Sequence, residues 1–175
     1  MTPDGSWLLW ESESIGAGGT SSDSIWLMRR STGGASPEKV LELAAPGDVL
    51  CSSNPKASSP CVLSQHEGKD LVFYSLDPVR GKGSRLGKIE VVGRYTGWCV
   101  SPDGSRLALV DQDKYEGRIE ALALADGAWH EVPLKPGGEH LQSIAWAADG
   151  KRARCHLPTV STWRSRLSRG TATSG

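Results

Sequence analysis

Short apolar runs recur along the whole chain, separated by polar stretches rich in glycine, proline and aspartate. Within several runs charged and apolar residues alternate, as in segments 88–92 and 118–121, and this is the period of a half-buried β-strand. No segment shows the sustained period of an amphipathic helix. We therefore predict an all-β chain, with strands at 7–10, 25–28, 40–43, 61–63, 71–76, 88–92, 98–100, 107–110, 118–124, 129–134 and 141–146.

A proline-aspartate-glycine turn precedes the clearest of these runs. In the segment 101–104 (Ser-Pro-Asp-Gly), proline presets φ, aspartate can bond to local backbone, and glycine accepts positive φ. Similar turns stand at 2–5 (Thr-Pro-Asp-Gly) and 147–150 (Ala-Ala-Asp-Gly), and a degenerate copy is read at 66–69 (His-Glu-Gly-Lys). The recurrence predicts a structural repeat.

The turn glycines lie at positions 5, 68, 104 and 150, which gives a repeat of about 40–50 residues with one longer interval. Four short strands per unit at this spacing are typical of β-propeller blades. We predict a partial β-propeller of three to four four-stranded antiparallel blades over residues 1–157. The repeats are expected near 1–43, 49–92, 96–135 and 141–157.

Three segments are expected to lie outside the strands. Residues 11–24 read as a glycine- and serine-rich loop, and residues 44–60 read as a long connection. Residues 158–175 are rich in serine, threonine and arginine without an apolar period, and predict a disordered tail or sequence foreign to the fold. Because the chain opens inside a copy of the turn, the first blade is expected to lack its inner strand. We expect a fragment of a larger ring, with open edges and marginal stability.

The repeat, best preserved at 101–108 and 146–150, resembles the WD40-like PD40 repeat of TolB-type β-propellers. It is also similar to the propellers of dipeptidyl-peptidase IV and prolyl oligopeptidase relatives. The segments 61–68 and 72–83 resemble the C-terminal propellers of some bacterial serine/threonine protein kinases and winged-helix regulators. The resemblance implies a sensor or interaction surface, and a turn motif that is structural and carries no catalytic role.

Charge and hydropathy exclude several functional classes. Lysine plus arginine and aspartate plus glutamate number 20 each, so the chain has no net charge that would favour nucleic acid or a membrane surface. No window approaches the length of an apolar transmembrane span, and the N-terminus lacks the features of a signal peptide. The charged residues after position 150 are all basic, which allows a nucleic-acid-binding tail as an alternative to disorder: Lys151, Arg152, Arg154, Arg164, Arg166 and Arg169.

Four cysteines are present, and none forms a C-x-x-C pair or a zinc-finger spacing with histidine. Cys51 and Cys61 flank a loop and can form a disulfide in an oxidising compartment, or remain two buried thiols. Cys99 lies in an apolar run and is expected in the core. We expect a periplasmic location if Cys51 and Cys61 pair, and a cytoplasmic one otherwise.

Sequence patterns for catalysis or cofactor binding are incomplete. The chain has no G-x-S-x-G, and His130-Glu131 begins a zinc-protease pattern that lacks its second histidine. The glycine-rich loop at 16–19 lacks a phosphate-binding signature, and the basic loop 77–83 reads as a solvated turn that could alternatively contact an anion. Asp4 to Trp7 differs in spacing from a sialidase Asp-box.

The remaining candidates are scattered polar residues. Three acidic residues are expected to form a solvated loop, and a cation site is the alternative: Asp111, Asp113 and Glu116. The histidines are read as surface or hydrogen-bonded residues rather than metal ligands: His66, His130, His140 and His156. We therefore name no catalytic, cofactor-binding or metal-binding residue and expect no cofactor.

These observations predict a non-catalytic β-propeller module for protein–protein interaction or ligand sensing, in a bacterial signalling protein. A protein or peptide partner is expected. The alternative is the substrate-gating propeller of a prolyl-oligopeptidase-type peptidase whose catalytic domain lies elsewhere. A TolB-like component of the cell envelope is a third reading. A kinase or winged-helix domain encoded upstream, or a hydrolase domain encoded downstream, would discriminate between the first two.

Overall fold

The computed structural model describes residues 1–15, 21–43, 47–57, 61–91, 96–111, 118–132 and 143–156, and these form β-strands, turns and connections without a helix. Within these ranges there is accordingly no helix that could cross a membrane. The strands are β1 Trp7–Ile15, β2 Ser21–Ser31, β3 Glu38–Leu43, β4 Val49–Cys51, β5 Cys61–Glu67, β6 Asp70–Asp77, β7 Gly81–Glu90, β8 Thr96–Val100, β9 Arg106–Asp111, β10 Arg118–Ala123, β11 Trp129–Val132, β12 Ser143–Trp146 and β13 Ala153–His156.

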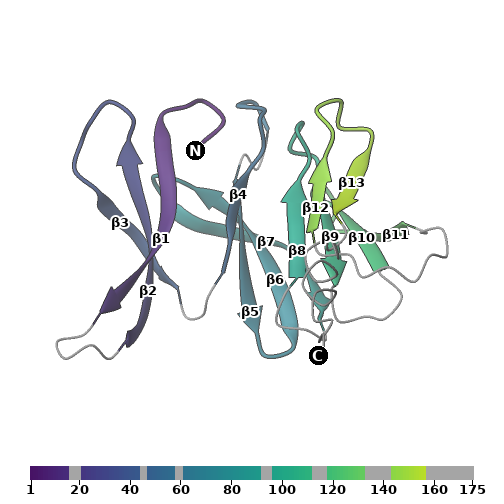
Figure 1. Ribbon diagram of the computed structural model, residues 1–175, viewed down its shortest axis with the longest axis horizontal. Helices are drawn as coiled ribbons and strands as arrows, with labels where there is room; N and C mark the ends of the chain where they lie inside the picture. The colour runs from purple at the N-terminus through teal and green to yellow at the C-terminus, as the bar shows by residue number, and fades with distance from the viewer. Residues whose placement is uncertain are drawn as a thin grey trace, which may run out of the picture.

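The strands form four antiparallel sheets in chain order (Figure 1). The first sheet has the order β1-β2-β3, the second β4-β5-β6-β7, the third β8-β9-β10-β11, and the fourth β12-β13. Every strand pairs with its neighbour in sequence, so each sheet is a meander. The predicted all-β fold built of four-stranded antiparallel units is confirmed.

Apolar clusters fill the spaces between consecutive sheets. Between the first and second sheets lie Leu27, Leu43, Cys61, Leu63 and Leu76. Between the second and third lie Val62, Leu71, Phe73, Val91, Trp98, Leu107, Leu109 and Leu122. Between the third and fourth lie Ala108, Val110, Ile119 and Ile144. The sheets therefore stack face to face, and the interior sheets are covered on both sides.

The central strands show how the sequence specifies this stacking. On β9, Leu107 and Leu109 pack toward the second sheet, whereas Ala108 and Val110 pack toward the fourth. These four residues are between 0% and 2% exposed. Because successive side chains of a strand point to opposite faces, a strand buried on both faces needs a continuous apolar run. The segment 107–110 supplies one, and 61–63 does the same in β5.

Several strand limits differ from the prediction. Segments 11–15 and 21–24 extend β1 and β2, so the glycine- and serine-rich segment is largely part of a hairpin rather than a loop. Residues 49–51, expected within a long connection, form β4 and pair with β5. Short or polar strands such as these contain no apolar run from which they could be predicted, and pairing with their partner strands fixes their conformation.

One turn was also misassigned. The turns at 2–5, 101–104 and 147–150 precede β1, β9 and β13, whereas Gly68 lies in the hairpin between β5 and β6, at the opposite end of the sheet. Reading 66–69 as a copy of the same turn is therefore wrong, because a glycine hairpin of this kind forms at either end of a meander. In the second sheet the corresponding connection is the segment after β4. The tail 158–175 lies outside the described residues.

Candidate functional site

One end of the stacked sheets carries the recurring turns, and we call it the turn face (the upper end in Figure 1). It holds residues 2–6, the segment 52–57, and residues 101–105 and 147–152. The hairpins β2–β3, β6–β7 and β10–β11 lie at the same end, because the strands alternate in direction. The repeat therefore gathers loops from all four sheets on one surface.

The aspartate of each turn is held by the turn itself. Asp103 accepts hydrogen bonds from the Ser101 hydroxyl at 2.5 Å, from the Ser105 N–H at 3.1 Å and from the Ser105 hydroxyl at 2.8 Å. Chiefly the Ser101 bond, and then the two from Ser105, lower the pKa of Asp103 from 3.8 to about 2. Asp4 has equivalent bonds to Thr2 and Ser6, led by the Ser6 hydroxyl, and its pKa is also lowered to about 2. These carboxylates stabilise the turns, in keeping with a structural role for the motif.

Successive turns also bind one another across the sheets. The Ser53 hydroxyl donates to the Pro102 carbonyl at 3.1 Å, and the Asn54 side-chain amide donates to the Asp103 carbonyl at 3.2 Å. One sheet further, the Arg106 guanidinium donates to the Gly150 carbonyl at 3.0 Å. The loops of the turn face are thus hydrogen-bonded from the second sheet to the third and from the third to the fourth.

A disulfide closes the connection of the second sheet. Cys51 and Cys61 lie directly opposite each other on β4 and β5 and are bonded to each other. This settles the alternative that the sequence left open between a disulfide and two thiols. The bridge fixes both ends of the segment whose residues Ser53 and Asn54 reach the third sheet. Cys99, expected in the core, is half-buried and packs against the cluster between the third and fourth sheets.

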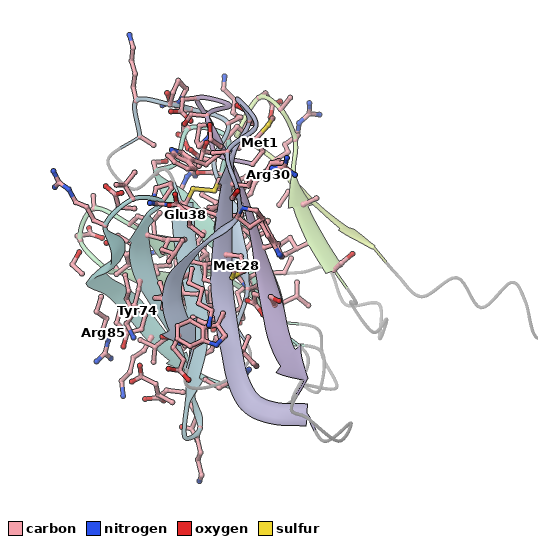
Figure 2. All side chains as sticks on the ribbon, turned by 90° about the vertical axis from the view of Figure 1, so that its left-hand side faces the viewer. Met1, Met28, Arg30, Glu38, Tyr74 and Arg85 are labelled. Carbon is pink, nitrogen blue, oxygen red and sulfur yellow. A yellow bond between two sulfur atoms is a disulfide. The ribbon has the colours of Figure 1, made fainter. Side chains whose placement is uncertain are left out.

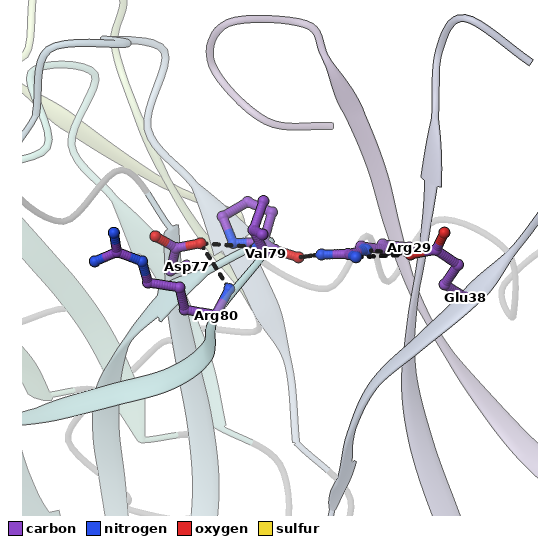
Figure 3. Close-up of polar contacts among 6 residues, drawn as sticks. Arg29, Glu38, Asp77, Val79 and Arg80 are labelled. Carbon is purple, nitrogen blue, oxygen red and sulfur yellow. Dashed lines mark hydrogen bonds and ion pairs between the residues drawn. The ribbon is translucent and has the colours of Figure 1, made fainter. Parts of the chain in front are cut away.

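Arg29 joins the first sheet to the second (Figure 3). Its guanidinium donates to Glu38 at 2.6 and 3.0 Å and to the Pro78 carbonyl at 2.8 Å, and it stacks 4.7 Å from the centre of the Trp7 ring. The planar, multidentate arginine head satisfies these partners at once. In the same hairpin Asp77 accepts the N–H groups of Arg80 and Val79, which lowers the pKa of Asp77.

Beside this contact, the turn face is hollowed at the junction of the first two sheets. The cavity measures about 190 Å³, and we call it the seam pocket. Its lining is Thr2, Pro3, Asp4, Trp7, Pro55, Cys61, Pro78 and Val79. Apolar groups dominate, with one carboxylate and one hydroxyl among them. Three separate segments build it: the first turn, the disulfide-closed connection and the β6–β7 hairpin.

The candidates named from the sequence do not converge on this pocket. His130 and Glu131 lie on β11 and are exposed, which fits the expected strand and not a helical zinc site. The described residues contain no group of three or more histidine, cysteine or acidic residues able to hold a metal. His140, Asp113, Glu116 and the glycine-rich loop 16–19 lie outside the described ranges, and the side chains of Asp111 and His156 are not described.

The pocket residues themselves were not singled out by the sequence. The sequence predicts a solvated basic turn at 77–83, but in the structure strand β7 begins at Gly81, and Pro78 and Val79 line the pocket. The turn at 2–5 is predicted from the sequence only as a structural turn of the repeat. The sequence does place one apolar residue, Val79, between Pro78 and Arg80 in this turn, and the structure shows its side chain 61% exposed. Its meaning depends on which other loops meet it.

Comparison with known proteins identifies the class by structure alone. No family model and no curated protein matches the sequence. TolB from Acinetobacter baumannii superposes with a TM-score of 0.63 at 16% identity, over 91% of this chain and 37% of TolB. A protein from Bacteroides uniformis provisionally named a 6-phosphogluconolactonase superposes with a TM-score of 0.56 at 19% identity, over 88% of this chain and 45% of that protein. A chain of a nidogen–laminin complex superposes with a TM-score of 0.55 at 12% identity, over 88% of this chain and 57% of that chain.

The chain therefore covers less than two thirds of each of these structures. Together with the four stacked antiparallel sheets, the likeness defines the chain as a partial β-propeller related in fold to TolB. This confirms the predicted fold class. Membership of the PD40 family remains a prediction.

Proposed function

We propose that the protein is a non-catalytic binding module, and that its turn face binds a protein or peptide partner. The seam pocket is the observation that carries this proposal. It is a concave site lined by Pro3, Trp7, Pro55 and Pro78, with the exposed Val79 at its rim. Interfaces concentrate their energy where a partner's side chain fills such an apolar pocket. About 150 Å³ of apolar cavity can hold a benzene-sized group, so the pocket has room for one side chain.

The surroundings of the pocket support a fixed binding site rather than an incidental gap. Arg29 holds the β6–β7 hairpin against the first sheet, and the disulfide holds the segment that contributes Pro55. A wall fixed before binding avoids part of the ordering cost of association. The Asp4 carboxylate in the lining is occupied by hydrogen bonds from Thr2 and Ser6, and the positive charge of Arg29 beside the pocket is balanced by Glu38. The remaining lining is apolar, so an uncharged apolar group fits the pocket.

Two further parts of the proposal rest on the sequence and on the disulfide. Disulfides persist in oxidising compartments, so the Cys51–Cys61 bond supports an extracytoplasmic location. The resemblance to kinase-linked and winged-helix-linked propellers supports a sensor role, in which partner binding is reported to an attached signalling domain.

A peptide library selected against the immobilised protein tests the binding site. We expect selected peptides to share one large apolar residue and to bind as synthetic peptides in calorimetry. Val79→Asp, at the pocket rim, should weaken binding at least about tenfold by placing a charge against the anchor. Val132→Asp is the matched control, because Val132 is 42% exposed on β11 and does not line the pocket. Equal affinity of the two variants, or failure to select any peptide, would refute the proposal.

A further inference from the structure

Two basic side chains converge on Tyr74, on the face of the second sheet that is turned toward the first. The Lys82 ammonium lies 3.7 Å from the centre of the Tyr74 ring and donates to the Gln65 side-chain oxygen at 2.7 Å. Arg85 lies directly opposite Tyr74 on β7, and Figure 2 labels these two residues together at its lower left. Lys82 and Arg85 are exposed, whereas Gln65 is 6% exposed. A buried amide and an aromatic ring therefore fix the position of an exposed ammonium group.

An irregularity in the β6–β7 ladder places the two cations on one face. Arg85 lies opposite Tyr74. Lys82 lies opposite Leu76, which is two residues from Tyr74 on β6, so two steps along β6 match three steps along β7. Residues three apart on a regular strand point to opposite faces, and the extra residue on β7 reverses this. Gly83 lies within the irregularity, and a Cβ atom there would lie 2.4 Å from a side-chain oxygen of β6. This close approach requires glycine, so the sequence itself specifies the local geometry.

The charges of Lys82 and Arg85 are not balanced within the described part of the chain, where neither lies within ion-pair distance of a carboxylate. A lysine ammonium has three donors and a guanidinium has five, and Lys82 gives one of its donors to Gln65. The carboxylate of Glu67, on the same sheet, accepts the Tyr74 hydroxyl instead. This bond chiefly raises the pKa of Tyr74, and the nearby charge of Arg85 opposes the rise. Donors of two cations therefore remain available beside the Tyr74 ring.

We propose that Lys82 and Arg85 bind an acidic side chain of a protein partner beside the ring of Tyr74. Ammonium and guanidinium donors are complementary to carboxylate oxygen atoms, and such charge-assisted bonds are stronger than neutral ones. The ammonium of Lys82 is positioned before binding, which reduces the ordering cost. One exposed charge pair contributes little affinity, so the acidic group belongs to a partner that makes further contacts rather than to a free anion. None of these residues lines the seam pocket, so the site does not depend on the function proposed above.

Titration with a short acidic peptide, followed through the backbone amide signals in NMR spectra, tests this site. The probe is the synthetic peptide acetyl-SDSDS-amide, and acetyl-SNSNS-amide is the neutral control. We expect the acidic peptide to bind weakly and saturably, and to shift the amide signals of Tyr74, Lys82 and Arg85. Added salt should weaken this binding, because the charges are exposed and screened. The neutral peptide should not bind.

Three matched variants separate this site from a general effect of net charge. Lys82→Gln and Arg85→Gln should each weaken binding by about two- to fivefold, as expected for one exposed charge pair. Lys39→Gln is the control, because the Lys39 ammonium makes the same kind of contact on the first sheet, 3.9 Å from the centre of the Trp26 ring. This variant should bind as the parent does.

Equal weakening in all three variants would show only a dependence on net charge, and would overturn the proposal. It is also overturned if Lys82→Gln or Arg85→Gln binds the acidic peptide as the parent does. Equal binding of the two peptides, or no shift at millimolar concentrations of the acidic one, has the same consequence.

Discussion

Two glycines in equivalent turns should differ in their tolerance of alanine, because only one of them is packed against a neighbouring sheet. Gly5 and Gly104 have φ values of +73° and +71°. A Cβ atom built on Gly5 meets nothing within 4 Å. A Cβ atom on Gly104 would lie 2.4 Å from the Ala57 Cβ and 3.1 Å from the Ser52 hydroxyl. The pair therefore separates the backbone cost from the packing cost.

The expected magnitudes follow from these distances. The left-handed conformation costs alanine about 1–2 kcal/mol, and Gly5→Ala should lower the free energy of unfolding by this amount alone. Carbon atoms pack at about 3.5–4.0 Å, so Gly104→Ala must displace the segment holding Ala57 by more than 1 Å. Overpacking of this kind costs about 1–3 kcal/mol. Displacement would also weaken the bonds that Ser53 and Asn54 make to the third sheet. We expect Gly104→Ala to lower the free energy of unfolding by about 2–5 kcal/mol from the first two terms, with the weakened hydrogen bonds adding to this.

Urea unfolding followed by tryptophan fluorescence measures both losses, and Ala57→Gly provides a rescue. Removing the Ala57 Cβ should restore most of the stability that Gly104→Ala loses through packing. The same change should not restore the stability lost by Gly5→Ala. Mutations at contacting residues are coupled in this way, whereas the stability effects of mutations at distant residues are additive. Equal losses for the two single variants, or no coupling between Gly104 and Ala57, would show that the segment 52–57 does not dock on the third sheet.

Three further changes test other contacts of the turn face. Replacing Cys51 and Cys61 by serine should lower the free energy of unfolding by about 2–3 kcal/mol, the chain-entropy value for a loop of this size, and a thiol reductant should have the same effect on the parent only. The pKa of Asp103 is lowered from 3.8 to about 2, so its ionised carboxylate stabilises the folded protein fully above about pH 4. This contribution is lost as the pH falls through about 2. Asp103→Asn should therefore reduce the fall in the free energy of unfolding that acid causes in the parent. Arg29→Lys should lower the free energy of unfolding in urea by about 1 kcal/mol and change tryptophan fluorescence. Arg30→Lys should do neither, because the Arg30 head donates to the exposed Ala35 carbonyl of its own hairpin.

The repeating part of the fold could be read from the sequence because it is specified locally. The turn at 101–104 and the apolar run at 107–110 are each sufficient to predict a turn followed by a buried strand. Their positions in the structure agree, down to the positive φ of Gly104. The short strand β4 could not be read in this way, since three residues carry no period and their conformation is fixed by pairing with β5.

The seam pocket was beyond sequence reasoning for a different reason. Its residues Pro3, Pro55 and Pro78 belong to three connections, and each by itself reads as an ordinary turn residue. What makes them a site is the stacking of two sheets, which brings the connections together. Sequence periodicity predicts that sheets stack but does not say which loops then share a surface. Besides Val79, the pair Cys51 and Cys61 was a partial signal, since the sequence left open whether a disulfide closes the segment between them, and the structure has that bond.

The pocket lies where the repeat is broken. The third and fourth sheets carry the compact aspartate-glycine turn, and the second sheet carries instead the longer connection closed by Cys51 and Cys61. A compact turn at that place would have no residue equivalent to Pro55, which lines the pocket from within the longer segment. The same segment docks on the third sheet through Ser53 and Asn54. The segment after β4, which departs from the repeat, therefore has two roles. It supports the stacking of the second and third sheets, and it forms a wall of the proposed binding site.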